Sequence, residues 1–285
     1  EMCIRDRIMI IGALLIPFLP HIIRQIYMMI LVLISAYSLT LGFGIHSTIN
    51  LMGFDFILFQ ADSLSLPFAI IFHIAAALNV IYGAHEKHWK QHVSIMSYSG
   101  AAIAAVHAGD LFTLFIWWEA TAFTSVFLIL AGNTYRSYKS AFRYILIQVT
   151  SGMFLLAGAI VLLINDGSAL LTKFDINSLY GQLIFIAFGI KAAFPLLNGW
   201  LQDSYPEASE IGTVALSTFT TKLAIFCFAK CFAGAWRRAC WVCSPRTSAG
   251  QRGAPSPSPP GARSSRSCCC LCCCCCCCCP SSTVK

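Results

Sequence analysis

The sequence predicts an all-α protein, a polytopic transmembrane bundle of about eight helices. Of its 285 residues, 58% are hydrophobic and only 11% are charged, and the mean hydropathy is +0.73. Soluble domains carry about 25% charged residues, so this composition indicates a membrane protein. The net charge of +7 is spread over loops and the C-terminal region. The sequence has no basic stripe with interleaved aromatic residues, the pattern that is typical of nucleic-acid binding.

Hydropathy along the chain predicts where the helices lie. Apolar runs of helical length are separated by short polar connections. Between the second and third runs, INLMGFDFILFQAD alternates enough to predict a short extracellular hairpin. The eight predicted helical segments are residues 8–19, 26–45, 63–84, 93–107, 110–131, 141–164, 181–201 and 209–234.

Composition divides the chain into four parts. Residues 1–7 (EMCIRDR) resemble translated sequencing adapter, and we interpret them as a non-native leader. Residues 8–109 hold the first four predicted helices, and residues 110–235 hold helices five to eight. Residues 236–285 turn into Arg, Ser, Pro and Cys low complexity, which we interpret as an artefactual tail, with a metal-binding tail as the alternative.

Cysteine usage predicts neither a metal nor a disulfide framework. Eleven of the 16 cysteines lie in the run 268–279, interrupted only by Leu271. Adjacent cysteines do not reproduce the paired spacing of a zinc site. We therefore expect no metal and no cofactor.

Loop charges predict the orientation of the helices. Connections after the first, third and fifth segments are rich in lysine and arginine, which retain a loop on the cytoplasmic side. The N-terminus should then face outside. The connection after the seventh segment breaks this alternation, because it holds Asp203, Glu207 and Glu210 without a basic residue. The basic residues are Arg24, Lys87, Lys90, Arg136, Lys139 and Arg143, and the acidic ones on the opposite side are Asp55, Asp62, Asp110, Asp166 and Asp175.

Three charged residues lie near the middle of predicted membrane helices: Glu119, Lys191 and Lys222. A charge at that depth costs about 2.5–3.5 kcal/mol on insertion scales, so it usually persists because it is paired or functional. One acid and two lysines on three separate helices are the parts of a proton relay. Helices five to eight are therefore the predicted proton-translocating part.

Lys191 is followed four residues later by Pro195, which lacks an N–H and breaks the helix beside the lysine. Free backbone groups at such a break are tolerated next to protein or water. Glu119 has apolar neighbours on its own helix face, so a Glu119–Lys191 ion pair is the economical arrangement. A neutral, protonated Glu119 is the alternative, and a static structural pair is the non-functional one.

Hydroxyl and amide groups accompany these charges. Thr218 lies one turn before Lys222, which is able to carry a transferable proton when desolvated. Tyr144 and Gln148 share one face of the sixth predicted helix with Ser151, and they either hold waters or only pack.

Three stretches are similar to the proton-antiporter membrane family. This family includes the antiporter-like subunits of respiratory complex I and the D-type subunit of multi-subunit (Mrp-type) sodium/proton antiporters. The stretches are DLFTLFIWWEATAFTSVFLI, FGIKAAFPLLNGWLQDSYPEAS and LSTFTTKLAIFCFAK. The resemblance extends over most of residues 8–234, and WWEATAFTS and WLQDSYPEA are more similar to the D-type antiporter subunit than to complex I.

The resemblance implies a five-helix bundle repeated in inverted form, of which this chain holds one copy, with a broken seventh helix. It also implies that Glu119 pairs with Lys191 and that Lys222 passes the proton on. Two positions depart from the family pattern. Asn198 stands where the family often has histidine, and Tyr205 stands where complex I relatives often have another. The sequence does not support a relay step that needs an imidazole at either position.

The sequence thus predicts a proton-translocating subunit of a monovalent cation/proton antiporter in the bacterial inner membrane. Its expected partners are the lipid bilayer, other membrane subunits, protons, and Na+ or K+. The nearest alternative is a proton-pumping membrane subunit of NADH-quinone oxidoreductase, in which case the chain would still hold no redox centre. A different alternative is a non-transporting scaffold whose buried charges only fix helix register.

The predicted orientation places the N-terminus outside the cell and the loop that holds Lys87 and Lys90 inside. Single cysteines introduced as Asp62→Cys and Lys90→Cys should therefore react with an impermeant thiol reagent from opposite sides of the membrane. We expect this result because loops rich in lysine and arginine stay on the cytoplasmic side. Labelling of both positions from the same side would overturn this topology.

Overall fold

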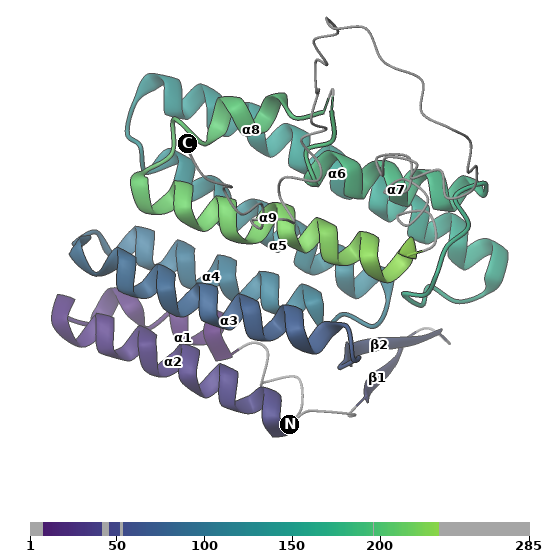
Figure 1. Cartoon of the computed structure of the whole chain (residues 1–285), viewed down its shortest axis with the longest axis horizontal. Coiled ribbons are helices and arrows are strands. Elements are labelled where there is room, and N and C mark those ends of the chain that lie inside the picture. Colours follow the sequence, from purple (N-terminus) through teal and green to yellow (C-terminus); the bar gives the residue numbers. More distant parts are fainter. Residues whose placement is uncertain (1–7, 42–45, 52–53, 196, 234–285) are drawn as a thin grey trace, which may run out of the picture. The chain divides into compact units, whose positions relative to one another are not determined.

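The computed structural model describes residues 8–41, 46–51, 54–195 and 197–233, which are coloured in Figure 1. In this part of the chain, a bundle of helices accompanies one β-hairpin. The elements in chain order are α1 (Ile8–Ala13), η2 (Ile16–Phe18), α2 (His21–Leu41), β1 (His46–Leu51), β2 (Phe54–Gln60), α3 (Ser65–Tyr82), η3 (Gly83–His85), α4 (Trp89–Val106), α5 (Leu111–Leu130), α6 (Tyr135–Asp166), α7 (Leu179–Lys191), α8 (Gly199–Ser204) and α9 (Glu210–Cys231).

Each predicted apolar segment contains a helix, and the predicted hairpin is present as the antiparallel pair β1–β2. The seventh segment is broken into α7 and α8, as expected. Three helices begin four to six residues earlier than hydropathy indicates, α2 at His21, α4 at Trp89 and α6 at Tyr135. Each of their first turns contains basic or other polar residues, which weaken the apolar signal. The start of α6 is fixed instead by Thr134, whose side chain accepts the Ser137 N–H.

Five helices in the described part of the chain are long and apolar enough to cross a membrane, namely α2, α3, α5, α6 and α9. The α4 helix is not among them, but it lies inside the bundle and packs against α1, α3, α5 and α9 (Figure 1). Small side chains allow such close approach between helices. The buried small residues of α4 are Gly100, Ala101, Ala102, Ala104 and Ala105.

Large apolar side chains cover the outer faces of several helices. Examples are Ile22 on α2, Ile74 on α3, Phe123 on α5 and Ile164 on α6, which are all more than half exposed. Apolar surface of this extent marks contact with a membrane or with another protein. Several polar side chains lie in the interior of the bundle instead, among them Ser125, Gln148 and Ser151.

The helix that carries Glu119 is fixed at its first turn and surrounded by other helices. Asp110 caps α5 by accepting the Thr113 N–H at 2.6 Å and the Thr113 hydroxyl at 2.8 Å. The body of α5 packs against α4, α6 and α9. The α7 and α9 helices begin at serine caps, Ser178 and Ser209. This arrangement places Glu119 and Lys191 at the contacts among α5, α6 and α7, whereas Lys222 is half-buried on α9.

Several sequence interpretations concern residues that the structure does not describe. The leader, residues 1–7, and the tail, residues 236–285 with its cysteine run, lie outside the described residues. The predicted division at residue 109 stays a prediction. The membrane orientation also stays a prediction.

Candidate functional site

The break after α7 is a capping motif at the helix end. The Phe194 N–H donates to the Gly189 carbonyl at 3.0 Å, and the Ala193 N–H donates to the Ile190 carbonyl at 3.1 Å. Ala193 has a positive φ of 56°. This pattern is a Schellman motif, in which a left-handed residue ends the helix. Lys191 is therefore the last residue of α7.

Pro195 directly follows this motif and is exposed. The sequence pattern attributes the break to the missing N–H of Pro195, whereas in the structure the helix has already ended when the chain reaches the proline. The aromatic ring of Phe194 stacks on Phe228 of α9, with centroids 5.1 Å apart. Pro195 thus prevents a restart of the helix, while the capping motif and the ring contact fix where α7 stops.

The Lys191 ammonium is enclosed by α5. The residue is 1% exposed, and its Nζ donates to the Trp118 carbonyl at 2.9 Å and to Thr121 Oγ1 at 2.7 Å. Nζ also lies 4.1 Å from the centroid of the Trp118 ring, a cation–π contact. The position in the last turn of α7 is favourable for a cation because of the helix dipole. Two of the three N–H donors of the ammonium are thus used by α5.

A hydrogen-bond chain holds the Trp118 ring in place. Its indole N–H donates to Ser151 Oγ of α6 at 3.1 Å, and Ser151 Oγ donates to the Ala187 carbonyl of α7 at 2.8 Å. The ring also packs on Phe188 at 5.3 Å between centroids. These contacts fix α5, α6 and α7 relative to one another at the level of Lys191.

The Glu119 carboxyl group lies against α6 at Gly152. A Cβ atom at position 152 would overlap Glu119 Oε1, so only glycine leaves room for the carboxyl group. Glu119 Oε1 is buried and has no hydrogen-bond partner among the described residues. A buried acceptor without a partner is unfavourable, which marks this oxygen for a further ligand or for a second position.

The predicted Glu119–Lys191 ion pair is not closed in this structure. The ammonium is bonded instead to Trp118 and Thr121, which lie on either side of Glu119 in the chain. Glu119 and Lys191 nevertheless interact electrostatically. The ion pairs found among the described residues lie elsewhere, and they are Arg143–Asp203 and Lys230–Asp62.

Lys222 is half-buried on α9, and its Nζ donates to the Ser217 carbonyl of the same helix at 2.5 Å. Thr218, the residue predicted to accompany it, donates to the Val214 carbonyl. Neither contact joins Lys222 to Lys191. The structure therefore places the second lysine on a helix that packs against α5 and α7, with its ammonium bonded to its own backbone.

A second cluster of polar side chains lies about two turns after Trp118 along α5. The Tyr144 hydroxyl of α6 shares a 2.8 Å hydrogen bond with Ser125 Oγ of α5, and Tyr144 also interacts with Thr220 of α9. Thr220 is hydrogen-bonded to the Tyr98 hydroxyl of α4. Tyr144 is among the residues that the sequence indicates, whereas Tyr98 and Ser125 are not, because a lone hydroxyl in an apolar helix gives no distinctive pattern.

Gln148, which the sequence also indicates, lies between these two groups on α6. It is 1% exposed, and within the described part of the chain neither its Oε1 nor its Nε2 has a hydrogen-bond partner. Thr121 and Trp118, which hold Lys191, are not predicted from the sequence. The sequence carries one weak signal for a polar face on α5, because Thr121 and Ser125 lie one turn apart.

The structure shows a further buried cation, Lys230, which is not among the predicted site residues. The Lys230 side chain is 8% exposed and forms a 2.9 Å ion pair with Asp62, just before α3. Lys230 follows Lys222 on α9 by two turns of helix and lies at its C-terminal end. The pair ties α9 to the segment after the hairpin, and the sequence indicates Asp62 only as a loop charge.

The two departures from the family pattern have different surroundings. Asn198 is exposed and precedes α8 without a side-chain capping bond. The Tyr205 hydroxyl donates to the Leu216 carbonyl of α9 at 3.0 Å, and its ring packs on Trp200. Tyr205 therefore has a packing role here. The described residues contain no group of three or more His, Cys, Asp or Glu side chains arranged to hold a metal ion.

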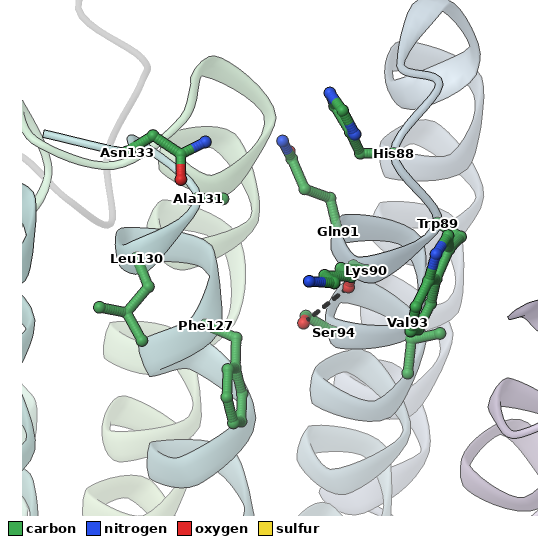
Figure 2. A pocket seen from close by; sticks show the side chains of 10 residues that line it. All are labelled: His88, Trp89, Lys90, Gln91, Val93, Ser94, Phe127, Leu130, Ala131 and Asn133. Atoms are coloured by element: carbon green, nitrogen blue, oxygen red, sulfur yellow. Dashed lines mark hydrogen bonds between the residues drawn. The ribbon is translucent and has the colours of Figure 1, made fainter.

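A pocket of ≈ 730 Å³ lies between the first turns of α4 and the last turns of α5 (Figure 2). Polar groups of His88, Gln91 and Asn133 and the apolar side chains of Val93 and Phe127 line it. None of the three charged candidates lines this pocket. It is therefore separate from the relay candidates.

Residues 108–241 match the family described as NADH:quinone oxidoreductase/Mrp antiporter, TM. This segment is similar to the proton-antiporter membrane family. It contains Glu119, Lys191 and Lys222, and it includes α5 to α9 entirely. The family match and the apolar helices together indicate an integral membrane protein, and the match is to membrane subunits of the Mrp or complex I type.

Relatives of both types match the chain. The NAD(P)H-quinone oxidoreductase chain 4 1 of Synechococcus elongatus is 27% identical over 178 residues, which cover 57% of this chain and 32% of the relative. The Na(+)/H(+) antiporter subunit A1 of Staphylococcus aureus is 25% identical over 252 residues, which cover 78% and 31%. The chain thus spans about a third of the length of these relatives.

One chain of a solved complex has a similar fold. A chain of respiratory complex I from Thermus thermophilus superimposes with a TM-score of 0.70 and 17% identity, covering 84% of this chain and 55% of that one. At this identity the likeness shows the fold alone. The predicted membrane helix bundle is confirmed.

Gly152→Ala is expected to displace the Glu119 carboxyl group while leaving the fold intact. The added methyl group overlaps the flexible end of Glu119, and alanine is favoured over glycine within a helix by about 1 kcal/mol. The thermal unfolding midpoint should be unchanged or higher, and the infrared band of the carboxyl group should shift. Gly199→Ala is the control, because nothing lies within 4 Å of its Cβ. A loss of stability confined to Gly152→Ala would contradict the expectation.

Proposed function

We propose that this chain is a proton-translocating subunit of a monovalent cation/proton antiporter, in which Lys191 and Lys222 carry protons and Glu119 gates them. The observation that carries the proposal is the buried Lys191 ammonium at the broken end of α7, held by α5 beside Glu119. A static structural role is less economical, because apolar residues usually replace a buried charge without loss of stability.

Two alternative positions of the Lys191 ammonium give the gate its chemistry. In the structure the ammonium is bonded to the Trp118 carbonyl and Thr121, and the Glu119 carboxyl group is unpaired at Oε1. In the second position the ammonium pairs with Glu119, which favours the charged forms of both groups. Movement between the two positions changes how readily Lys191 releases a proton, which is what coupling to another ion requires.

Lys222 is the proposed next carrier. It lies on α9, which packs against both α5 and α7, and its ammonium makes a single hydrogen bond to the Ser217 carbonyl. An ammonium with donors to spare is able to exchange protons with waters or with neighbouring subunits. Thr218, Tyr144 and Gln148 are the supporting polar groups, and Pro195 prevents the helix from restarting after the capping motif of α7.

The nearest alternative is a membrane subunit of NADH-quinone oxidoreductase, which the Synechococcus relative favours. The antiporter relative is called subunit A1, whereas the motifs in this chain are more similar to the D-type subunit. The assignment to the D type, the exchanged ion and the partner subunits are therefore proposals, as is the bacterial inner membrane. A pH gradient that needs an electron donor and quinone, and that no Na+ or K+ gradient produces, would favour the alternative.

Lys191→Ala should abolish proton movement in the assembled complex while leaving membrane insertion intact. In proteoliposomes, the pH change driven by a Na+ or K+ gradient should fall about 100-fold or more, the range that loss of a proton-transfer group gives. Lys191→Met, which keeps the side-chain volume, should behave alike. Lys173→Ala, at an exposed position, is the matched control. Near-normal transport by a well-inserted Lys191 variant would remove the relay role.

Glu119→Gln should lose coupling, whereas Glu119→Asp should keep part of it. Glutamine retains size and hydrogen bonding, but it lacks the charge that pairs with a protonated Lys191. The measurement is the ratio of protons to cations exchanged, together with the transport rate. If the glutamine variant transports as well as the unmodified protein, Glu119 is structural or permanently neutral.

A further inference from the structure

We infer that Gln148 is a positioning residue that holds buried water between Lys191 and the hydroxyl groups of Tyr144 and Tyr98. This inference rests on the proposed function and deepens it, because it names the connection by which a proton leaves the Lys191 site. Gln148 itself neither gains nor loses a proton. Its amide orients the water that does.

The register of α5 and α6 places Gln148 at the level of Lys191. Trp118 of α5 is bonded to Ser151 of α6, and Ser125 of α5 is bonded to Tyr144 of α6. The chain advances equally per residue in both helices. Three residues forward from Trp118 is Thr121, and three residues back from Ser151 is Gln148, so these two face each other.

Thr121 is the residue that accepts the Lys191 ammonium, and its own hydroxyl proton is donated to the Trp118 carbonyl at 2.7 Å. It therefore has no proton free to pass on in this arrangement. The ammonium has a third N–H for which the described residues offer no acceptor. An acceptor on the side of Gln148 would complete its hydrogen bonding.

The amide of Gln148 requires partners of its own. Both of its polar atoms are buried and unpaired, as is Glu119 Oε1 one helical turn farther along α6, at Gly152. Buried polar groups are normally satisfied, and buried water makes about three hydrogen bonds to groups that are otherwise unpaired. The Gln148 amide, Lys191 and Glu119 together offer donors and acceptors for such water.

On its other side, Gln148 lies one turn from Tyr144, whose hydroxyl begins a chain of hydrogen-bonding groups. Tyr144 is bonded to Ser125 and interacts with Thr220, and Thr220 is bonded to Tyr98. Water at Gln148 therefore connects the ammonium on α7 to the hydroxyl groups on α4 and α9. No other polar residue of α6 lies on this face between Tyr144 and Ser151 in the described structure.

Proton movement through this connection balances. The Lys191 ammonium gives one proton to the water and becomes a neutral amine, and the water passes a different proton to the Tyr144–Ser125 pair. Each hydroxyl group releases one proton as it receives another, and the last proton goes to Lys222 on α9, the next carrier in the proposed relay, after Lys222 has released its own proton. Reprotonation of Lys191 from the opposite side restores the starting state.

Gln148→Leu tests the inference in the assembled complex in proteoliposomes. Leucine keeps most of the side-chain volume but has no polar atom to orient water. The rate of proton transport should therefore fall about tenfold or more. Gln148→Asn keeps the amide and makes room for more water, so it should restore at least half of the rate. Thr150→Val on the exposed face of α6 is the matched control and should transport normally.

The outcomes separate this inference from the proposed function. Normal transport by Gln148→Leu, while Lys191→Ala is inactive, overturns the water connection and leaves the relay intact. Normal transport by Lys191→Ala overturns both. Equal losses in Gln148→Leu and Gln148→Asn, with a lowered unfolding midpoint, show a structural role and also overturn the inference. If the leucine variant does not assemble, an electron cryomicroscopy map of the unmodified complex decides: water density bonded to the Gln148 amide supports the connection, and a dry amide overturns it.

Discussion

Burial of the Lys191 ammonium is the constraint on which the arrangement of α5, α6 and α7 depends. An ammonium inside a helix bundle needs acceptors, and the Trp118 carbonyl and Thr121 supply them from α5. The Trp118 ring covers the cation only because Ser151 holds the indole and is itself bonded to α7. Three helices are thereby fixed at one level. The Schellman motif ends α7 there, so that the lysine lies at the favourable end of the helix dipole.

The unpaired groups lie next to this satisfied centre. Glu119 Oε1 and the Gln148 amide are buried without partners, while the lysine between them is well bonded. Such an imbalance is unfavourable for a purely structural core. It is suited to a site where a proton or a water molecule changes position, since a group without a fixed partner is able to accept a new one. Gly152 belongs to the same arrangement, because a side chain there would push the carboxyl group away.

The membrane determines how these polar groups are enclosed. Apolar side chains such as Ile74 and Phe123 cover the outside, and the small residues of α4 allow close packing within. The buried polar side chains around Lys191 are confined to the contacts among α4, α5, α6, α7 and α9. This confinement explains why a chain of hydroxyl and amide groups runs through the interior of the bundle, where the cost of exposing it to lipid is avoided.

The sequence alone determined the helix bundle, the hairpin and the charged residues, because apolar runs and rare intramembrane charges are visible one residue at a time. It also carried the family resemblance of the segment around Glu119, Lys191 and Lys222. The tertiary structure decided which groups meet. Lys191 is bonded to Trp118 and Thr121, with the Glu119 pair open, because the register between α5 and α7 is set by Ser151 and by the capping motif at Ala193. Contacts of this kind depend on the relative rotation and height of packed helices, which no single helix pattern encodes.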